Sequence, residues 1–154
     1  MAEQFLTLMA VLDNESQKNM ARWYDELRAA GFKGTQTPDI PYHISLASFS
    51  LEKESEVVQE MKKLACEFEP IPVYISHIGI FSGGKVLFGA PDIKSTDILS
   101  LHEAIHTETI ERFPWTPHVT ILIDETETVQ NALGVFIKSF QPFCGKITRY
   151  STII

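Results

Sequence analysis

The chain has 154 residues, of which 44% are hydrophobic and 21% are charged, and its net charge at pH 7 is −7. These values are typical of a soluble globular protein, and we expect a single domain over residues 1–154. The negative charge disfavours a surface that follows an extended nucleic-acid backbone, because such surfaces are normally basic. A small nucleotide, or one RNA end held in a cleft, is compatible with it.

No membrane span or secretion signal is predicted at the start of the chain. The first apolar run, residues 5–12, has no basic segment before it and is much shorter than the roughly 20 residues that cross a bilayer. The two cysteines, Cys66 and Cys144, are far apart and are interpreted as reduced thiols. We therefore expect a cytoplasmic monomer that does not bind membranes.

Hydrophobic periodicity predicts that strands and helices alternate along the chain. In chain order, the predicted elements are a strand at 5–12, a helix at 15–30, a strand that contains His43, a helix at 54–68, strands at 73–81 and 85–90 that form a hairpin, a helix at 94–112, a strand at 117–123, a helix at 125–140 and a strand at 143–153. This order predicts an α+β fold.

The second half of the chain repeats features of the first half in the same order. Residues 54–59, Glu-Ser-Glu-Val-Val-Gln, resemble residues 125–130, Glu-Thr-Glu-Thr-Val-Gln, and Asp13 matches Asp92 near the start of each half. A repeat of about half the chain length indicates a duplicated lobe rather than a solenoid. We expect two pseudo-symmetric lobes, each a mostly antiparallel sheet backed by helices, with a cleft between them.

The repeat also includes two short motifs, His43-Ile44-Ser45 and His118-Val119-Thr120. Side chains two positions apart in a strand share one face, so each motif presents an imidazole and a hydroxyl together. If the lobes face each other, a general acid, a general base and two hydroxyl hydrogen-bond donors meet in one cleft. This chemistry requires no metal ion.

The paired motifs, their strand context and the repeat resemble the 2H phosphoesterase superfamily over nearly the whole chain. Bacterial and archaeal members are often labelled RNA 2′,3′-cyclic phosphodiesterase or 2′-5′ RNA ligase. The resemblance implies that His43 and His118 are catalytic and that Ser45 and Thr120 bind the substrate phosphate. No metal and no cofactor are expected. Serine in the first motif replaces the threonine of many members and keeps the hydroxyl donor.

The resemblance implies a metal-independent phosphoesterase that hydrolyses a 2′,3′-cyclic phosphate or a 2′-5′ linkage in RNA or a small nucleotide. The reverse reaction would be a 2′-5′ ligation. The alternative from another class is a non-catalytic module that binds a nucleotide or RNA end on the same fold. Lys85 and Arg149 are candidate cations near the cleft, although both residue types are more typical of solvated surface.

A competing pattern lies in the predicted helix 94–112. His102-Glu103-Ala104-Ile105-His106 spells H-E-x-x-H, in which two imidazoles one helical turn apart hold zinc and the glutamate acts as a general base. The glycine and histidine of the longer zinc-protease signature do not follow it. The repeat aligns His102 with Trp23 and His106 with Leu27, so we interpret both histidines as members of a packing face. Zinc hydrolysis is the third hypothesis.

Overall fold

Strands and helices alternate in the structure much as the hydrophobic periodicity predicts. The computed structural model describes residues 4–92, 96–111 and 114–154. The elements are β1 (Leu6–Leu12), α1 (Asn14–Ala29), β2 (His43–Phe49), a short 3-10 helix (Leu51–Lys53), α2 (Glu54–Glu67), β3 (Ile71–Ile80), β4 (Val86–Pro91), α3 (Thr96–Glu103), β5 (Val119–Ile123), α4 (Thr126–Ser139) and β6 (Phe143–Ile153). The hairpin between β3 and β4 turns at Gly83 and Gly84, whose φ angles of 96° and 70° suit glycine.

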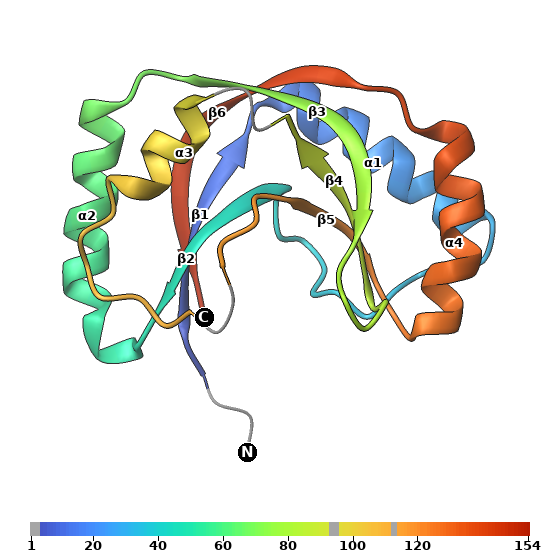
Figure 1. The fold of residues 1–154 in the computed structure, drawn as a ribbon, viewed down its shortest axis with the longest axis horizontal. Coiled ribbons are helices and arrows are strands. Elements are labelled where there is room, and N and C mark those ends of the chain that lie inside the picture. The colour runs from blue at the N-terminus through green and yellow to red at the C-terminus, as the bar shows by residue number, and fades with distance from the viewer. Residues whose placement is uncertain (1–3, 93–95, 112–113) are drawn as a thin grey trace.

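The strands form one six-stranded antiparallel sheet in the order β2-β1-β6-β3-β4-β5 (Figure 1). This order is symmetric: β2 corresponds to β5, β1 to β4, and β6 to β3. The predicted α+β fold with two pseudo-symmetric lobes is therefore confirmed. The two lobes are halves of one continuous sheet and are joined at its centre by β6 and β3.

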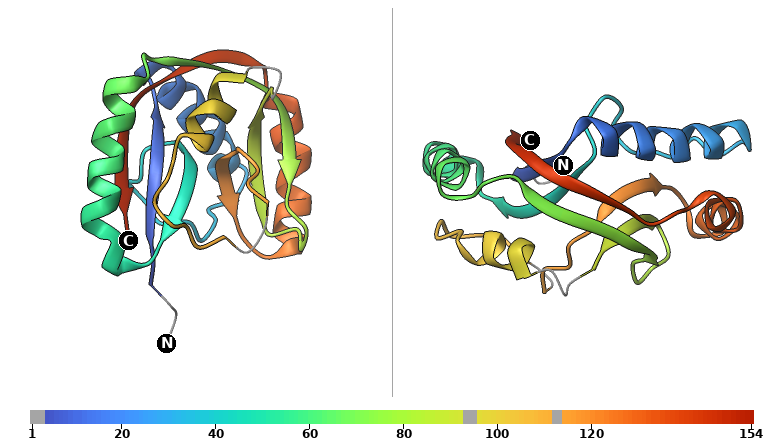
Figure 2. Two further views of the ribbon diagram at one scale, coloured as in Figure 1. Left: turned by 60° about the vertical axis from the view of Figure 1, so that its left-hand side comes forward. Right: turned by 90° about the horizontal axis from the view of Figure 1, so that it is seen from above.

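The helices follow the same symmetry. α2 and α3 lie beside the half of the sheet that contains β1 and β2, whereas α1 and α4 lie beside the other half (Figure 1). α1 and α3 are on opposite sides of the molecule when it is seen from above (Figure 2). α1 thus lies away from β2, the strand that follows it in the chain, and contacts α4 and β5, whereas α3 contacts β3 and lies on the side of α2.

Matching hydrogen bonds show that the two halves share local geometry. The amide of Asp13, just after β1, donates to the carbonyl of Lys146 in β6 at 2.8 Å. The amide of Asp92, just after β4, donates to the carbonyl of Tyr74 in β3, also at 2.8 Å. Because β6 corresponds to β3, these two bonds are equivalent, as the sequence match between Asp13 and Asp92 predicts.

The predicted helix 94–112 is wrong over its second half, because α3 ends at Glu103. The amides of Ala104 and Ile105 still bond to the carbonyls of Ser100 and His102, but those of His106 and Thr107 do not continue this pattern. They donate instead to the carboxylate of Glu60, which is buried on α2. A partner from another helix thus satisfies the backbone and ends α3. Lys94 and Arg112, the predicted bounds, lie outside the described residues.

The core consists of aliphatic and aromatic side chains between the sheet and the helices. Trp23 of α1 packs against Phe136, Phe140 and Phe143, with ring centroids 5.4, 5.0 and 5.5 Å away. This cluster holds α1 to α4 and to the start of β6. In the described part of the chain, no helix is long and apolar enough to cross a membrane.

Candidate active site

The first motif begins β2, at one edge of the sheet. His43 lies opposite Val11 of β1, and Ser45 lies opposite Met9. Ile44 between them is fully buried, whereas His43 and Ser45 are partly exposed. The alternation confirms that His43 and Ser45 share a face, as strand geometry predicts.

The second motif begins β5, at the other edge of the sheet. His118 directly precedes this strand, and Thr120 lies opposite Phe88 of β4. Val119 is fully buried, whereas Thr120 is partly exposed. The ring of His118 makes an edge-to-face contact with Phe81 at 4.6 Å and lies 5.2 Å from Phe88, so two aromatic rings hold its orientation.

The two motifs come together although they occupy opposite edges of the sheet. The sheet curves so that β2 and β5 are in contact without a ladder between them. The charge of His43 reaches His118 strongly enough to lower the pKa of the second imidazole. The structure therefore brings His43 and His118 into one site, as the repeat predicts.

Both histidines make the same hydrogen bond. Nδ1 of His43 lies 2.8 Å from the carbonyl oxygen of Pro41, and Nδ1 of His118 lies 2.8 Å from that of Thr116. A carbonyl oxygen can only accept, so Nδ1 carries the proton in both rings. Nε2 is then the nitrogen that exchanges a proton: neutral, it is a base, and protonated, it is an acid.

Burial lowers the pKa of both imidazoles. For His43 this effect is offset in part by the hydrogen bond to Pro41, which favours the protonated ring. For His118 the bond to Thr116 acts in the same direction, and the nearby charge of His43 lowers the pKa further. The two rings thus compete for protons, so that the state in which both are protonated is disfavoured.

This competition can be measured by NMR. Replacing His43 with glutamine removes its charge, so the pKa of His118 should rise in a pH titration of its imidazole Cε1–H signal. The exposed His106 supplies a control, and His106→Asn should leave the pKa of His118 unchanged. An unaltered His118 pKa in His43→Gln would mean that the rings are too far apart to act on one substrate.

Gln17 of α1 fixes the chain just before the first motif, a role that the sequence analysis missed. Its side-chain oxygen accepts from the amide of Tyr42 at 2.8 Å, and its side-chain nitrogen donates to the carbonyl of Tyr42 at 2.8 Å. The same nitrogen lies 3.1 Å from the carbonyl of Leu12. Residue 42 is thereby tied to α1 and β1 immediately before His43. No local sequence signal marks a glutamine for this task.

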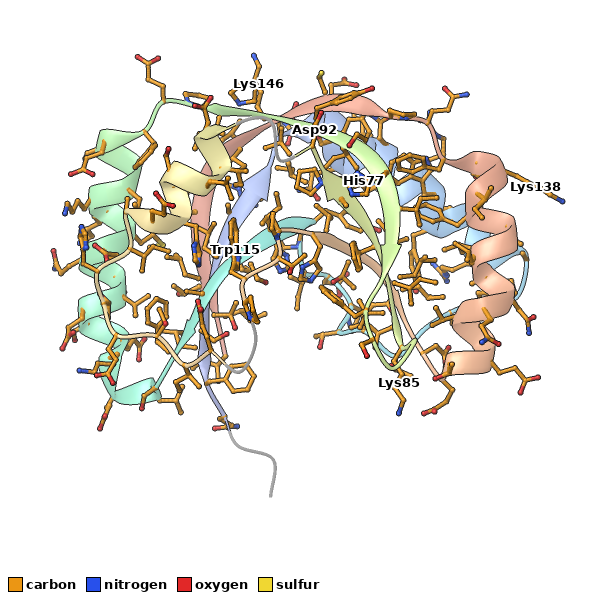
Figure 3. The ribbon with its side chains drawn as sticks, in the orientation of Figure 1. His77, Lys85, Asp92, Trp115, Lys138 and Lys146 are labelled. Carbon is orange, nitrogen blue, oxygen red and sulfur yellow. The ribbon has the colours of Figure 1, made fainter. Side chains whose placement is uncertain are left out.

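Trp115 connects the two motifs, and the sequence analysis also missed this role. It lies near the middle of the molecule, three positions before His118 (Figure 3). Its indole N–H donates to the carbonyl of Ser45 at 2.9 Å, and its ring stacks on His102 at 4.0 Å with an interplanar angle of 2°. His102 in turn lies 3.5 Å, Nε2 to Oε1, from Glu111. The segment before the second motif is thus fastened to the strand of the first.

A cleft of about 660 Å³ opens beside the histidines. Three segments line it: β2, the β3–β4 turn and the segment before β5. The lining residues are Ser45, Ala47, Ser48, Phe81, Ser82, Ile110, Glu111, Pro114, Trp115, Thr116 and His118. Two of the four predicted site residues, Ser45 and His118, belong to this lining, whereas His43 and Thr120 do not. The candidate cations are also elsewhere. Lys85, after the β3–β4 turn, pairs with Glu125 at 3.7 Å (Figure 3). Arg149 lines a separate cavity beside α2.

The H-E-x-x-H pattern does not have the geometry of a zinc site. His102 lies in the last turn of α3, but the helix ends at Glu103, so His106 is no longer one helical turn away on the same face. His102 packs on Trp115, as its alignment with Trp23 predicts. His106 is exposed, so the prediction that it belongs to a packing face is wrong. Among the described residues, no group of three or more His, Cys, Asp or Glu side chains is arranged to hold a metal ion.

Comparisons with known proteins agree with this fold. The sequence model of the 2′-5′ RNA ligase superfamily matches residues 16–153. A crystal structure described as a phosphoesterase is similar, with a TM-score of 0.58 and 19% identity over 97% of this chain and 87% of that one.

Two crystal structures of E. coli LigT are similar as well. The complex with NADP+ has a TM-score of 0.56 and 20% identity over 97% of this chain and 86% of LigT. The complex with 3′-AMP has a TM-score of 0.57 and 19% identity over the same 97% and 86%. A sequence comparison with curated proteins gives no match. The family match covers both motifs and every strand except β1, and we conclude that the chain belongs to the 2′-5′ RNA ligase superfamily of 2H phosphoesterases.

Proposed function

We propose that this protein is a metal-independent phosphoesterase that hydrolyses a 2′,3′-cyclic phosphate, or a 2′-5′ linkage, in RNA or a small nucleotide. The observation that carries the proposal is the matched pair of histidines. Each ring donates through Nδ1 to a carbonyl two residues earlier, and the rings are close enough to affect each other's protonation. A pure binding site has no need for two such equivalent bases.

In the proposed reaction, one neutral imidazole takes a proton from a water molecule, whose oxygen attacks phosphorus. The other imidazole, protonated, gives its proton to the ribose oxygen as the bond between that oxygen and phosphorus breaks. The products are a phosphomonoester and a free ribose hydroxyl. The lowered pKa values of both rings favour the neutral base, and a bound phosphate anion would favour the protonated acid.

Ser45 and Thr120 are proposed to hold the non-bridging phosphate oxygens. Each shares the exposed face of its strand with a motif histidine, so its hydroxyl can reach the same group. Hydroxyl donors stabilise charge as it builds on the phosphoryl oxygens. Nucleotide ligands are compatible with the size of the cleft, and the E. coli LigT structures with NADP+ and 3′-AMP support a nucleotide-sized ligand.

The test is a substrate panel with product analysis. Purified protein is assayed on 2′,3′-cyclic mononucleotides and on a 2′-5′ dinucleotide, with and without EDTA, with the variant His43→Ala/His118→Ala as the blank. We expect hydrolysis of at least one class that persists in EDTA and is lost in the variant. The position of the phosphate in the product identifies the bond that breaks.

Two outcomes would contradict the proposal. Binding of the panel compounds without turnover would favour the non-catalytic module. Activity that EDTA abolishes but the double variant retains would instead require a metal site outside the two motifs.

A further inference from the structure

We propose that Gln36, in the segment between α1 and β2, is a positioning residue for the second motif. Its side chain braces a bulge in β5 and thereby fixes where Thr120 and His118 lie in the site. The inference rests on the proposed function and names a further residue on which that site depends.

Each motif strand contains a bulge directly after its hydroxyl residue. Consecutive residues of β4 pair with Thr120 and Leu122 of β5, so the register skips Ile121. The same skip occurs in β2, directly after Ser45. A bulge interrupts the ladder locally and changes the direction of nearby side chains, and bulges are common beside active sites. The direction of each motif hydroxyl therefore depends on how the adjacent bulge is held.

The side chain of Gln36 holds the bulge of β5. Its Nε2 donates to the carbonyl of Ile121 at 3.2 Å, and its Oε1 accepts from the amide of Ile123 at 3.0 Å. The amide of the preceding residue, Thr35, also donates to the carbonyl of Ile123, at 2.6 Å. β5 ends the sheet and forms a ladder with one strand only, so these bonds replace part of a second neighbouring strand. The carbonyl that Gln36 binds belongs to the bulge residue, next to Thr120.

Two contacts place Gln36 for this task. Gly34 has a φ angle of 76°, a left-handed conformation that suits glycine, and a Cβ at this position would overlap with Oε1 of Gln36. The start of the segment is tied to α1, because the hydroxyl of Tyr24 donates to the carbonyl of Lys33 at 2.5 Å. Gln36 is thus held on both of its sides and is not a freely rotating surface side chain.

The first motif is braced in the equivalent way. The amide of Ile110 donates to a carbonyl of β2, as the amide of Thr35 does to a carbonyl of β5. Each donor lies eight positions before the motif histidine that follows it, and each acceptor lies five positions after the histidine of the braced motif. Trp115 adds its bond to the carbonyl of Ser45, beside the bulge of β2. Each motif is therefore braced by the segment that leads to the other motif.

The experiment compares Gln36→Ala with the wild type on the panel compound that the wild type hydrolyses fastest. We expect kcat and kcat/KM to fall together by about tenfold or more, because a misplacement of about 1 Å at a reacting group can cost about 10²-fold. In an NMR titration of the same variant, the Cε1–H signal of His118 should change its position and its pKa. The signal of His43, whose strand keeps its own brace, should change less.

Two further variants separate positioning from a general effect. Gln130→Ala changes an exposed glutamine of α4 and should leave the rates and both histidine signals unchanged. Gly34→Ala keeps the glutamine but displaces it, so it should lower kcat and shift the His118 signal in the same way as Gln36→Ala. Thermal melting shows whether each variant is folded at the temperature of the assay.

An unchanged kcat in a folded Gln36→Ala variant would overturn the inference. A lower kcat with an unaltered His118 signal would also overturn it, because the second motif would then be in its original place. The NMR measurement needs no substrate. Absence of turnover by the wild type would therefore count against the proposed function, and the His118 signal would still decide whether Gln36 positions this ring.

Discussion

Replacing either His43 or His118 with alanine should lower kcat/KM for a 2′,3′-cyclic nucleotide by about 10²–10⁴-fold, because each ring would supply one of two proton transfers. The kcat/KM of the double variant should be little lower than that of the less active single variant, since an acid and a base that act on one substrate act as a unit. Steady-state rates on the purified variants measure this. Circular dichroism and thermal melting show whether each variant keeps the native fold.

The control for a general effect of removing a histidine is His106→Asn. His106 is exposed and contacts Glu60 through its backbone amide rather than its ring, so its replacement should leave kcat/KM unchanged. Full activity in a folded His118→Ala variant would rule out the two-histidine mechanism.

Replacing Trp23 with alanine should lower the free energy of unfolding by about 3–5 kcal/mol, the range for removing a large aromatic side chain from a core. Trp23 is 3% exposed and meets three phenylalanine rings that belong to α4, the segment after it and β6. The cavity would therefore open between α1 and α4 rather than within one helix. Urea unfolding followed by circular dichroism measures the change.

Trp23→Phe is the matched variant, because it keeps an aromatic ring in the cluster and should lose clearly less stability than Trp23→Ala. Equal stability of Trp23→Ala and the wild type would contradict this account of the packing between α1 and α4. Because α1 also carries Gln17, which fixes the residue before His43, a folded Trp23→Ala variant should show reduced turnover as well.

Features with a strong local signal could be predicted from the sequence. Hydrophobic periodicity predicted the bounds of β6 correctly, and those of α2 and α4 to within a residue at each end. The face shared by His43 and Ser45 followed from strand geometry. The correspondence of the two halves followed from short matches in a common order, of which the equivalent hydrogen bonds of Asp13 and Asp92 are the structural counterpart.

Features that depend on a distant partner could not be predicted. In the sequence, helical periodicity continues beyond Glu103. In the structure, the end of α3 depends on the carboxylate of Glu60, a charged residue of α2 that the sequence alone would place on the solvent-exposed face of its helix. The bond from Trp115 to Ser45 and the clamp of Gln17 on Tyr42 also join segments that are far apart in the chain. The packing of α1 beside α4 could not be predicted either, because it depends on the curvature of the whole sheet.

The position of β6 has a consequence for the order in which the protein folds. β6 is the sixth strand along the chain, yet it lies at the centre of the sheet, where residues 143–147 pair with β3 and residues 147–153 pair with β1. The β1–β2 pair and the β3–β4–β5 group each consist of strands that are consecutive in the chain, but only β6 joins the two groups into one sheet. Such non-local pairing is slow, because a long loop must close before any contact is gained. We therefore expect the spacing between His43 and His118 to be set late in folding, so that the appearance of activity would report completion of the sheet rather than formation of either half.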